Sequence, residues 1–345
     1  MIYFQCDYAE GAHPAILKAL TDTNFEQTEG YGCDPHSKNA EALIRCALGR
    51  DDARVYFTVG GTQTNQVVIA SLLKPHQGVV SADTGHINVH ETGAIEATGH
   101  KVLAIPHENG KIPAEKLEAY LQNFRADDTF EHIVEPGMVY ISSPTELGTL
   151  YSKSELEALN RICREFDIPL FLDGARLGYG LAAENNDVTL SDIASLCDVF
   201  YIGGTKCGAL FGEAVVFTGD KTLDRHFRPI MKQHGAMLAK GRLLGIQFET
   251  LFTDELYTRI TRDAVIHAMR IKEAFREKGC EFLIDSSTNQ QFPILKRAYI
   301  EKLSEKFAFM VWPDHGEDEL PTRFCTSWAT NKEAVDVLIQ EIKAL

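Results

Sequence analysis

The chain has 345 residues, of which 44% are hydrophobic and 24% are charged, as in an ordinary globular protein. Its formal net charge of −15 argues against nucleic acid or an anionic membrane as the main partner. No apolar run is long enough to span a membrane, and the acidic N-terminal stretch predicts no signal peptide. The eight cysteines form no C-x-x-C pair, so we expect reduced thiols, no metal site and a cytoplasmic location.

The first sixty residues contain two predicted helices, over about 14–20 and 39–48, and a polar, glycine-rich loop between them at 29–35. A strand is predicted at 54–58. Apolar residues with helical spacing then run from 66 to 73, where Lys-Pro ends the helix.

Gly60, Gly61 and Thr62 lie between that strand and that helix. Free backbone N–H groups and the positive end of the helix both face such a turn, which makes it a natural phosphate site. The turn is neither a P-loop nor a dinucleotide fingerprint. Glycines also serve simply to reverse the chain, so the turn alone is weak evidence.

The next strand is predicted at 79–81 and leads into a loop that contains His86. A histidine just past a strand end can stack on an aromatic cofactor or move protons, although many loop histidines do neither. Further strands are predicted at 101–105 and 138–142, with helices at 114–124 and 155–166. We assign Ser154 and Glu157 to a capping box at the start of the last of these helices.

Three short apolar runs follow, at 169–172, 198–202 and 214–217, with a helix predicted at 190–196 between the first two. Asp173 ends the first run, and Lys206 follows the second after two glycines and Thr205. Ligands bind at the carboxyl ends of parallel strands in open α/β sheets, so we expect Asp173 and Lys206 to lie at one edge.

An acid and a lysine placed in this way suit pyridoxal phosphate. The lysine amine can hold the cofactor aldehyde as a Schiff base, and the carboxylate can keep the ring nitrogen protonated. Either residue alone is more often a surface charge, and it is the pair in this setting that favours the cofactor.

The remainder of the chain predicts a second, smaller unit. A buried helix at 242–251 closes a large domain that we assign to residues 1–251. A long amphipathic helix at 259–278 opens a small α+β domain, residues 252–345. Within it we predict the order strand, strand, helix, strand, strand, helix, at 281–284, 291–295, 299–306, 307–311, 322–325 and 332–343.

With these pieces placed, the chain resembles the threonine aldolase and aromatic amino acid β-eliminating lyase family, over nearly its whole length. The resemblance implies the pyridoxal phosphate-dependent fold type I of aspartate aminotransferase, with a mostly parallel central sheet. Seven motifs in the order of the family carry it: Cys6-Asp7, 31–35, 60–65, Gly85-His86 with Glu91, 173–176, Thr205-Lys206 and Arg323.

The resemblance also implies roles for individual residues. Lys206 is similar to the Schiff-base lysine, Asp173 to the partner of the ring nitrogen and His86 to the histidine that stacks on the ring. Gly60, Gly61 and Thr62 resemble the phosphate cradle, with Thr205 beside the cofactor. The residues that it places around the ring oxygen and the substrate are Arg176, Arg323 and Cys6.

Some positions differ from the usual pattern of the family. Cys6 stands where serine is common, and a G-G-G-M-R run that helps to bind the phosphate of a neighbouring subunit is absent, leaving Lys232 or Lys240 for that role. The Glu-Asn-Thr-His loop of many members is replaced by residues 142–146, and a second proton-transfer histidine falls near His132.

The resemblance implies cleavage of a β-hydroxy-α-amino acid of the L-threonine or L-allo-threonine type into glycine and an aldehyde. The alternative is β-elimination from an aromatic or sulfur-containing amino acid, which uses the same lysine and aspartate. A non-catalytic binding protein is the third possibility, and the presence of Lys206 argues against it. The family also implies a homodimer or homotetramer with shared active sites.

Overall fold

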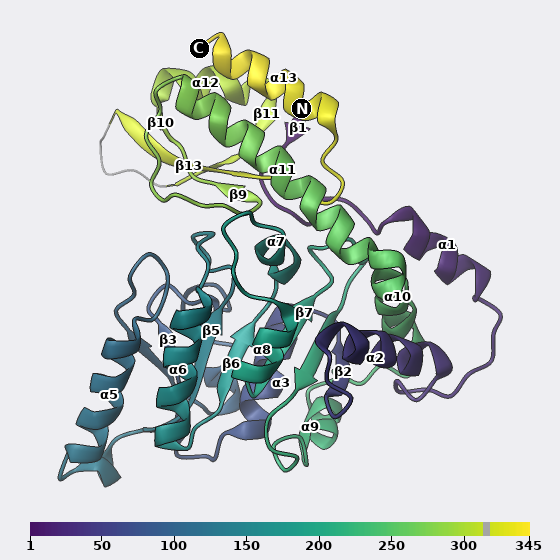
Figure 1. Ribbon diagram of the computed structural model, residues 1–345, viewed down its shortest axis with the longest axis vertical. Coiled ribbons are helices and arrows are strands. Elements are labelled where there is room, and N and C mark those ends of the chain that lie inside the picture. The colour runs from purple at the N-terminus through teal and green to yellow at the C-terminus, as the bar shows by residue number, and fades with distance from the viewer. Residues whose placement is uncertain (313–317) are drawn as a thin grey trace.

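A computed structural model describes residues 1–312 and 318–345, and its largest element is a seven-stranded sheet with the strand order β2-β8-β7-β6-β5-β3-β4 (Figure 1). The strands are β2 (Arg54–Thr58), β3 (Gln77–Ala82), β4 (Val102–Ile105), β5 (Glu135–Ser142), β6 (Leu170–Asp173), β7 (Val199–Gly203) and β8 (Glu213–Phe217). Strands β4, β3, β5, β6 and β7 run parallel, and β8 is antiparallel to both of its neighbours. The predicted α/β class with a mostly parallel sheet is confirmed.

Helices cover both faces of this sheet (Figure 1). On one face lie α2 (Pro35–Leu48), α5 (Ala114–Ala126), α6 (Lys153–Phe166) and α8 (Leu190–Leu196), and on the other α3 (Gly61–Leu72) and α9 (Phe227–Gln233). Side chains alternate between the two cores along each strand, as Val139 and Ile141 in one core and Met138 and Tyr140 in the other show. The apolar runs predicted in the sequence are therefore strands buried on both sides.

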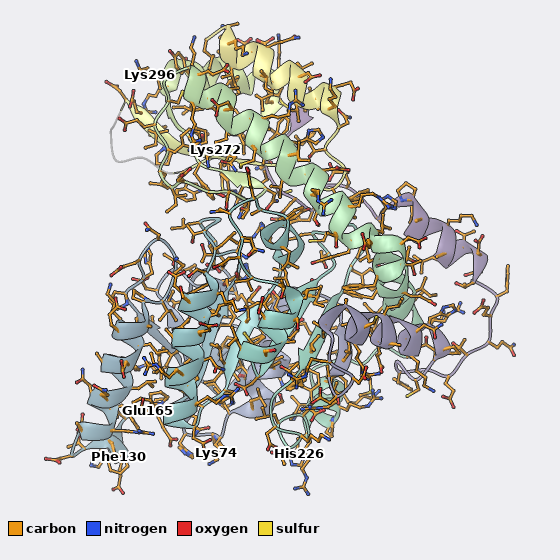
Figure 2. The ribbon with its side chains drawn as sticks, viewed as in Figure 1. Lys74, Phe130, Glu165, His226, Lys272 and Lys296 are labelled. Atoms are coloured by element: carbon orange, nitrogen blue, oxygen red, sulfur yellow. The ribbon has the colours of Figure 1, made fainter. Side chains whose placement is uncertain are left out.

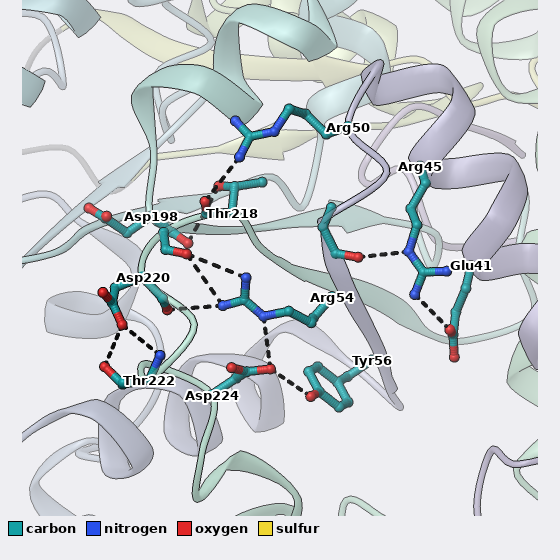
Figure 3. Close-up of polar contacts among 12 residues, drawn as sticks. Glu41, Arg45, Arg50, Arg54, Tyr56, Asp198, Thr218, Asp220, Thr222 and Asp224 are labelled. Atoms are coloured by element: carbon teal, nitrogen blue, oxygen red, sulfur yellow. Dashed lines mark hydrogen bonds and ion pairs between the residues drawn. The ribbon is translucent and has the colours of Figure 1, made fainter.

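The antiparallel pair at the edge is tied down by a polar cluster (Figure 3). Arg54 Nε of β2 donates to Asp224 Oδ2 at 3.0 Å, and the hydroxyl of Tyr56 donates to the same oxygen at 2.8 Å. These bonds fasten the outer strand β2 to the segment that follows β8. Arg54 is the first residue of β2 and Asp224 follows β8, so the cluster lies at the edge of the sheet opposite to Thr58 and Glu213.

The remaining helices of the first 252 residues are short or connect the two parts of the molecule. They are α1 (Pro14–Asp22), α4 (His86–Val89), α7 (Leu177–Leu181), α10 (Arg242–Phe252) and the 3₁₀ turns at Glu96–Thr98 and Phe130–His132. The long helix α11 (Leu256–Glu277) begins directly after another 3₁₀ turn, Thr253–Glu255, and rises from the large sheet into the C-terminal part (Figure 1).

The C-terminal part has its own sheet and core. Strands β9 (Gln290–Gln291), β10 (Ile294–Lys296), β12 (Met310–Val311) and β13 (Glu319–Cys325) form a four-stranded sheet covered by α11, α12 (Arg297–Ser304) and α13 (Lys332–Lys343). The N-terminal strand β1 (Ile2–Tyr3) pairs in parallel with β11 (Phe307–Ala308), and Phe4 packs into this same core. The division at residues 251 and 252 stays a prediction, and the first four residues pack with the C-terminal part.

All strands of the large sheet except the antiparallel β8 direct their carboxyl ends toward the C-terminal part (Figure 1). Lys74, three residues before β3, lies at the opposite end of the large sheet from Lys272 of α11 (Figure 2). After β5 the chain reaches Gly148, whose carbonyl accepts a hydrogen bond from Ser286 Oγ at 3.0 Å. The edge at which ligands bind in this class of sheet is therefore the one that meets the smaller part.

Several predicted details are wrong. The capping box of α6 is Ser152 with Glu155, two residues earlier than predicted, because Ser152 has the extended backbone of an N-cap. Residues 281–284 form only an isolated bridge at Phe282, and α3 begins at Gly61 rather than at residue 66. In the part of the chain that the structure describes, no helix has both the length and the apolarity needed to cross a membrane.

Candidate active site

Strands β5, β6, β7 and β2 end at the edge described above, and the antiparallel strand β8 begins there between β7 and β2. In the sheet register Ser142 of β5 lies opposite Asp173 of β6, and Gly203 of β7 lies opposite Glu213, which in turn pairs with Thr58 of β2. The segments that follow these strands hold the glycine turn, the predicted lysine and the predicted aspartate. The sheet therefore brings these three sequence-distant features together.

Asp173 is buried and accepts hydrogen bonds on both carboxylate oxygens. Tyr201 donates to Oδ1 at 2.5 Å and Tyr140 to Oδ2 at 2.6 Å, and the backbone N–H of Ala175 and the amide of Asn65 add bonds of 3.0 and 3.2 Å. Burial alone would raise the pKa of Asp173, but the nearby charge of His86 and these donors lower it. Asp173 is thus kept ionised deep in the molecule.

Lys206 follows β7 and lies in the same network of charges. Its carbonyl accepts a bond of 2.5 Å from the hydroxyl of Tyr179, which fixes the backbone of the turn. Burial and the positive charge of Arg176 lower the pKa of Lys206, against the opposing effects of the carboxylates Asp7 and Asp173. A lowered pKa favours the neutral amine, the form that attacks a carbonyl carbon.

His86 begins the short helix α4, and its ring is held by a buried carboxylate. Nδ1 of His86 lies 2.7 Å from Glu91 Oε1, which also accepts a bond of 2.8 Å from Asn65. Burial would lower the pKa of His86, but the hydrogen bond to Glu91 and the charge of Asp173 outweigh it and raise the pKa. Asn65 therefore links the partners of His86 and Asp173 into one network.

The turn after β2 is shaped to hold an anion. Gly60 is the N-cap of α3, has extended backbone and makes no side-chain capping bond. A Cβ at Gly60 would meet nothing within 4 Å, whereas one at Gly61 would come within 3.0 Å of the hydroxyl of Tyr201. A helix start leaves its first backbone N–H groups without partners inside the helix, and this start adjoins Tyr201, which binds Asp173.

Arg176 is placed against a residue that the sequence assigned no role. Its Nε and Nη2 donate to the two oxygens of Asp7 at 2.7 and 3.0 Å, and Asp7 also accepts a bond of 2.9 Å from Asn289. Cys6, beside Asp7, is half-buried. Roles for Arg176 and Cys6 in binding cofactor or substrate remain predictions.

Arg323 of β13 lies on the opposite wall, in the smaller part. Its Nη2 donates to the carbonyl of Gln5 at 3.3 Å, while its buried Nε has no hydrogen-bond partner among the described residues. Burial and the charges of His86 and Arg323 lower the pKa of His90, whose ring centre lies 5.6 Å from that of His86. A buried donor without a partner beside the histidines is suited to a carboxylate.

Several site residues were not predicted. Glu213 accepts bonds from Thr205 Oγ1 at 2.8 Å and from the N–H of Gly204 at 3.0 Å, and burial raises its pKa to about 8. Glu146 accepts a bond from the N–H of His86. Glu213 directly precedes the predicted strand 214–217, and Glu146 lies four residues after the predicted strand 138–142, which is the signal that could have found them.

Three further residues with predicted roles, His132, Lys232 and Lys240, lie outside the network around Asp173 and His86. His132 is exposed in the 3₁₀ turn before β5, at the far end of that strand from Ser142. The Nζ of Lys232 lies 4.5 Å from the centre of the Tyr31 ring, and Lys240 is exposed. Contact between either lysine and a neighbouring subunit remains a prediction.

Comparisons with known proteins agree with this geometry. A profile of the beta-eliminating lyase family matches residues 5–297. The chain is 42% identical to the threonine aldolase of Leishmania major, with a TM-score of 0.96, covering 100% of this chain and 99% of that one. The chain belongs to the threonine aldolase and β-eliminating lyase family. It is therefore a pyridoxal phosphate-dependent lyase, as the sequence predicted.

More distant similarities extend the same result. The chain is 29% identical to the low specificity L-threonine aldolase of Pseudomonas aeruginosa, over 99% of this chain and 96% of that protein. An aspartate aminotransferase from Thermus thermophilus has a TM-score of 0.72 at 17% identity, with 100% of this chain and 92% of that one covered. The last similarity shows the fold alone, and it confirms the predicted fold type.

Proposed function

We propose that this protein cleaves a β-hydroxy-α-amino acid of the L-threonine or L-allo-threonine type into glycine and an aldehyde. The observation that carries the proposal is the full-length similarity to the Leishmania major threonine aldolase, at 42% identity. The position of His86 beside Asp173 supports cleavage at a hydroxyl-bearing carbon, because a group that moves a proton stands next to the group that fixes the cofactor.

The residues of this edge fit pyridoxal phosphate. We assign the cofactor aldehyde to Lys206, the ring nitrogen to Asp173 and the face of the ring to His86. The phosphate is assigned to Gly60, Gly61 and Thr62 with Thr205 nearby, because the helix start is open at Gly60, where a Cβ would meet nothing within 4 Å. When bound, the cofactor supplies an electron sink for the electron pair left at Cα when the Cα–Cβ bond breaks.

The protein's own contribution is to place charges and protons. Asp173 stays ionised through the hydroxyls of Tyr140 and Tyr201, so a positive charge at the ring nitrogen is stabilised. His86, oriented at Nδ1 by Glu91, offers Nε2 to hold or move a proton at the β-hydroxyl, directly or through water. Positioned groups of this kind contribute roughly 10²–10⁴ in rate.

The substrate carboxylate is assigned to Arg323. Its buried Nε lacks a hydrogen-bond partner within the described residues, so a carboxylate there would satisfy it. The guanidinium of Arg176 already binds Asp7 through two donors, which makes it the lesser candidate. We keep Arg176 and Cys6 as secondary contacts of the ring oxygen and of the substrate.

The proposal is tested with purified protein and both threonine diastereomers. We expect acetaldehyde and glycine in equal amounts, together with a visible absorption band that Lys206→Ala abolishes along with turnover. Lys74→Ala, at the far end of the sheet, is the matched control and keeps both. Release of pyruvate in place of acetaldehyde would assign the protein to β-elimination, and full activity of Lys206→Ala would refute the role of that lysine.

We also propose a homodimer or homotetramer with shared active sites, located in the cytoplasm. Phe25 is 94% exposed and Tyr31 is also exposed, which is unusual for large apolar side chains and is consistent with a covering subunit. All eight cysteines are free, as expected in a reducing compartment. Light scattering in solution measures the subunit number.

A further inference from the structure

The loop between β5 and α6 returns to the active site. It is closed by backbone bonds from Thr145 N–H to the carbonyl of Thr149 at 2.9 Å and from Gly148 N–H to that of Thr145 at 2.8 Å. The side chains of Thr145 and Thr149 add a bond of 2.6 Å between their hydroxyls. Glu146 lies inside this closed turn, so its carboxyl group has a fixed direction.

That direction is toward His86. Glu146 Oε1 accepts a bond of 2.9 Å from the backbone N–H of His86 and one of 2.7 Å from Ser142 Oγ. His86 is the first residue of α4, and Gly85 before it has no side chain that could cap the helix. Glu146, sixty residues away in the sequence, therefore takes the place of the missing cap.

Glu146 also belongs to the electrostatics of the site. Burial raises its pKa despite the hydrogen bond from Ser142, and the charges of Asp173 and His86 act on it in opposite directions. Glu91 holds the ring of His86 from the other side, at Nδ1. The two carboxyl groups thus hold His86 at two separate points, the backbone nitrogen and the ring.

We infer that Glu146 is a positioning residue, which holds the backbone of His86 so that the imidazole Nε2 is presented to the reacting hydroxyl. This inference rests on the proposed function, because it assigns a purpose to the position of His86. With Nδ1 bound to Glu91, Nε2 is the one ring nitrogen that makes no hydrogen bond within the described residues. A shift of the helix start would move Nε2 even though the bond to Glu91 could persist.

The two hydrogen bonds to Glu146 require an acceptor oxygen at this position and do not require a negative charge. Glu146→Gln retains an oxygen that can accept from His86 N–H and Ser142 Oγ, whereas Glu146→Ala retains neither bond. We expect Glu146→Ala to lower kcat about 10–100-fold with KM changed less than about threefold, since a misplacement of about 1 Å can cost on the order of 10²-fold. Glu146→Gln should return kcat to within about threefold of the native value.

A second measurement does not depend on activity. The visible circular dichroism of the bound cofactor reports how the ring is held in its asymmetric surroundings, and we expect it to change in Glu146→Ala and to be restored in Glu146→Gln. The cofactor dissociation constant should stay within about twofold in both variants, because Lys206, Asp173 and the glycine turn, to which the aldehyde, ring nitrogen and phosphate are assigned, do not contact Glu146 through any hydrogen bond of the described residues. Asp198→Asn is the control for loss of a buried carboxylate, since Asp198 lies at the opposite end of β7 and should alter neither kcat nor the dichroism.

The inference is overturned if Glu146→Ala keeps kcat within twofold of native, or if Glu146→Gln is as impaired as Glu146→Ala. Should Glu146→Ala fail to fold, Ser142→Ala removes one of the two bonds to Glu146 and must produce a smaller change of the same kind in kcat and dichroism. If the native protein releases no acetaldehyde, the proposed function fails by itself, and the dichroism of the variants still decides the role of Glu146.

Discussion

Glu91 raises the pKa of His86, because it is the carboxylate that is hydrogen-bonded to the ring. Glu91 is 5% exposed, so its charge acts through protein rather than water. Burial of the imidazole works in the opposite direction and would lower the pKa of His86 if Glu91 were neutral. The charge of Asp173 also raises the pKa, so Glu91 supplies part of the effect that outweighs burial.

Glu91→Gln should therefore lower the pKa of His86. The charge that stabilises the protonated ring is removed, and the effect of burial then prevails. Titration of the His86 ring protons by NMR in the holoenzyme measures the shift. We also expect kcat to fall by about tenfold or more, because the ring loses the partner that fixes its orientation.

Glu26→Gln is the control for this prediction. Glu26 lies 2.9 Å from the ring of His36, a histidine whose pKa its two carboxylate partners raise despite partial burial. The substitution should lower the pKa of His36 and leave that of His86 unchanged. An unaltered His86 titration in Glu91→Gln would contradict the role assigned to Glu91.

The sequence alone identifies a residue of the site when the features that place it are close to it in the chain. Lys206 and Asp173 were predictable because each follows an apolar run that could only be a buried strand. Glu146 was not, since its partner His86 is sixty residues distant and the bond depends on how an irregular loop closes. The pairing of Arg176 with Asp7 could not be predicted from the sequence for the same reason, because the two residues are distant in the chain.

At the scale of elements, the strands of the large sheet could be predicted from their apolar runs, whereas the antiparallel direction of β8 and the starts of α3 and α6 could not. Helix α3 begins five residues before its apolar pattern does, because the first turn contains small and polar residues around the glycine turn. The capping box of α6 could be read at Ser152 or at Ser154, and only backbone geometry decides between the two.

The start of α3 offers a test of the anion site that does not disturb the fold. Gly60→Ala adds a Cβ that meets nothing within 4 Å, at an extended φ that any residue adopts. We expect the unfolding midpoint of the cofactor-free protein to stay unchanged. The dissociation constant for pyridoxal phosphate, measured by fluorescence titration, should rise by about tenfold or more because the methyl group occupies the phosphate cradle.

Gly11→Ala is the matched control, as a Cβ there also meets nothing within 4 Å. Gly11 precedes α1 and belongs to no group assigned to the cofactor. The control should leave both the midpoint and the dissociation constant unchanged. An unchanged cofactor affinity in Gly60→Ala would show that the phosphate lies elsewhere.

At the scale of the whole molecule, Asp7 joins segments from three distant parts of the chain. It is fully buried, and it binds Arg176 before α7 and Asn289 in the smaller part. Burial raises the pKa of Asp7, but the charges of Arg176 and Lys206 more than offset this and lower it. The N-terminal segment is thereby fastened between the large sheet and the C-terminal part, beside the candidate active site.

Asp7→Asn should destabilise the protein by about 3–5 kcal/mol at pH 7, because it leaves the guanidinium of Arg176 buried without its counter-charge. Since folding lowers the pKa of Asp7, the stability it contributes is full above the ordinary value of 3.8 and is lost as the pH falls through the lower folded value. The difference in unfolding free energy between native protein and variant should therefore be constant from pH 7 to pH 5 and shrink only below pH 3.8. Urea denaturation at each pH measures it.

Asp22→Asn, which breaks the exposed ion pair of Lys18 and Asp22 on α1, is the control and should alter the unfolding free energy little at any pH. An Asp7→Asn variant as stable as the native protein would mean that Arg176 finds another partner or reaches water. A difference that already shrinks between pH 7 and pH 5 would point to a raised pKa of Asp7, which is possible only if Arg176 does not remain beside it. Both results would remove the link between the N-terminal segment and the wall of the active site.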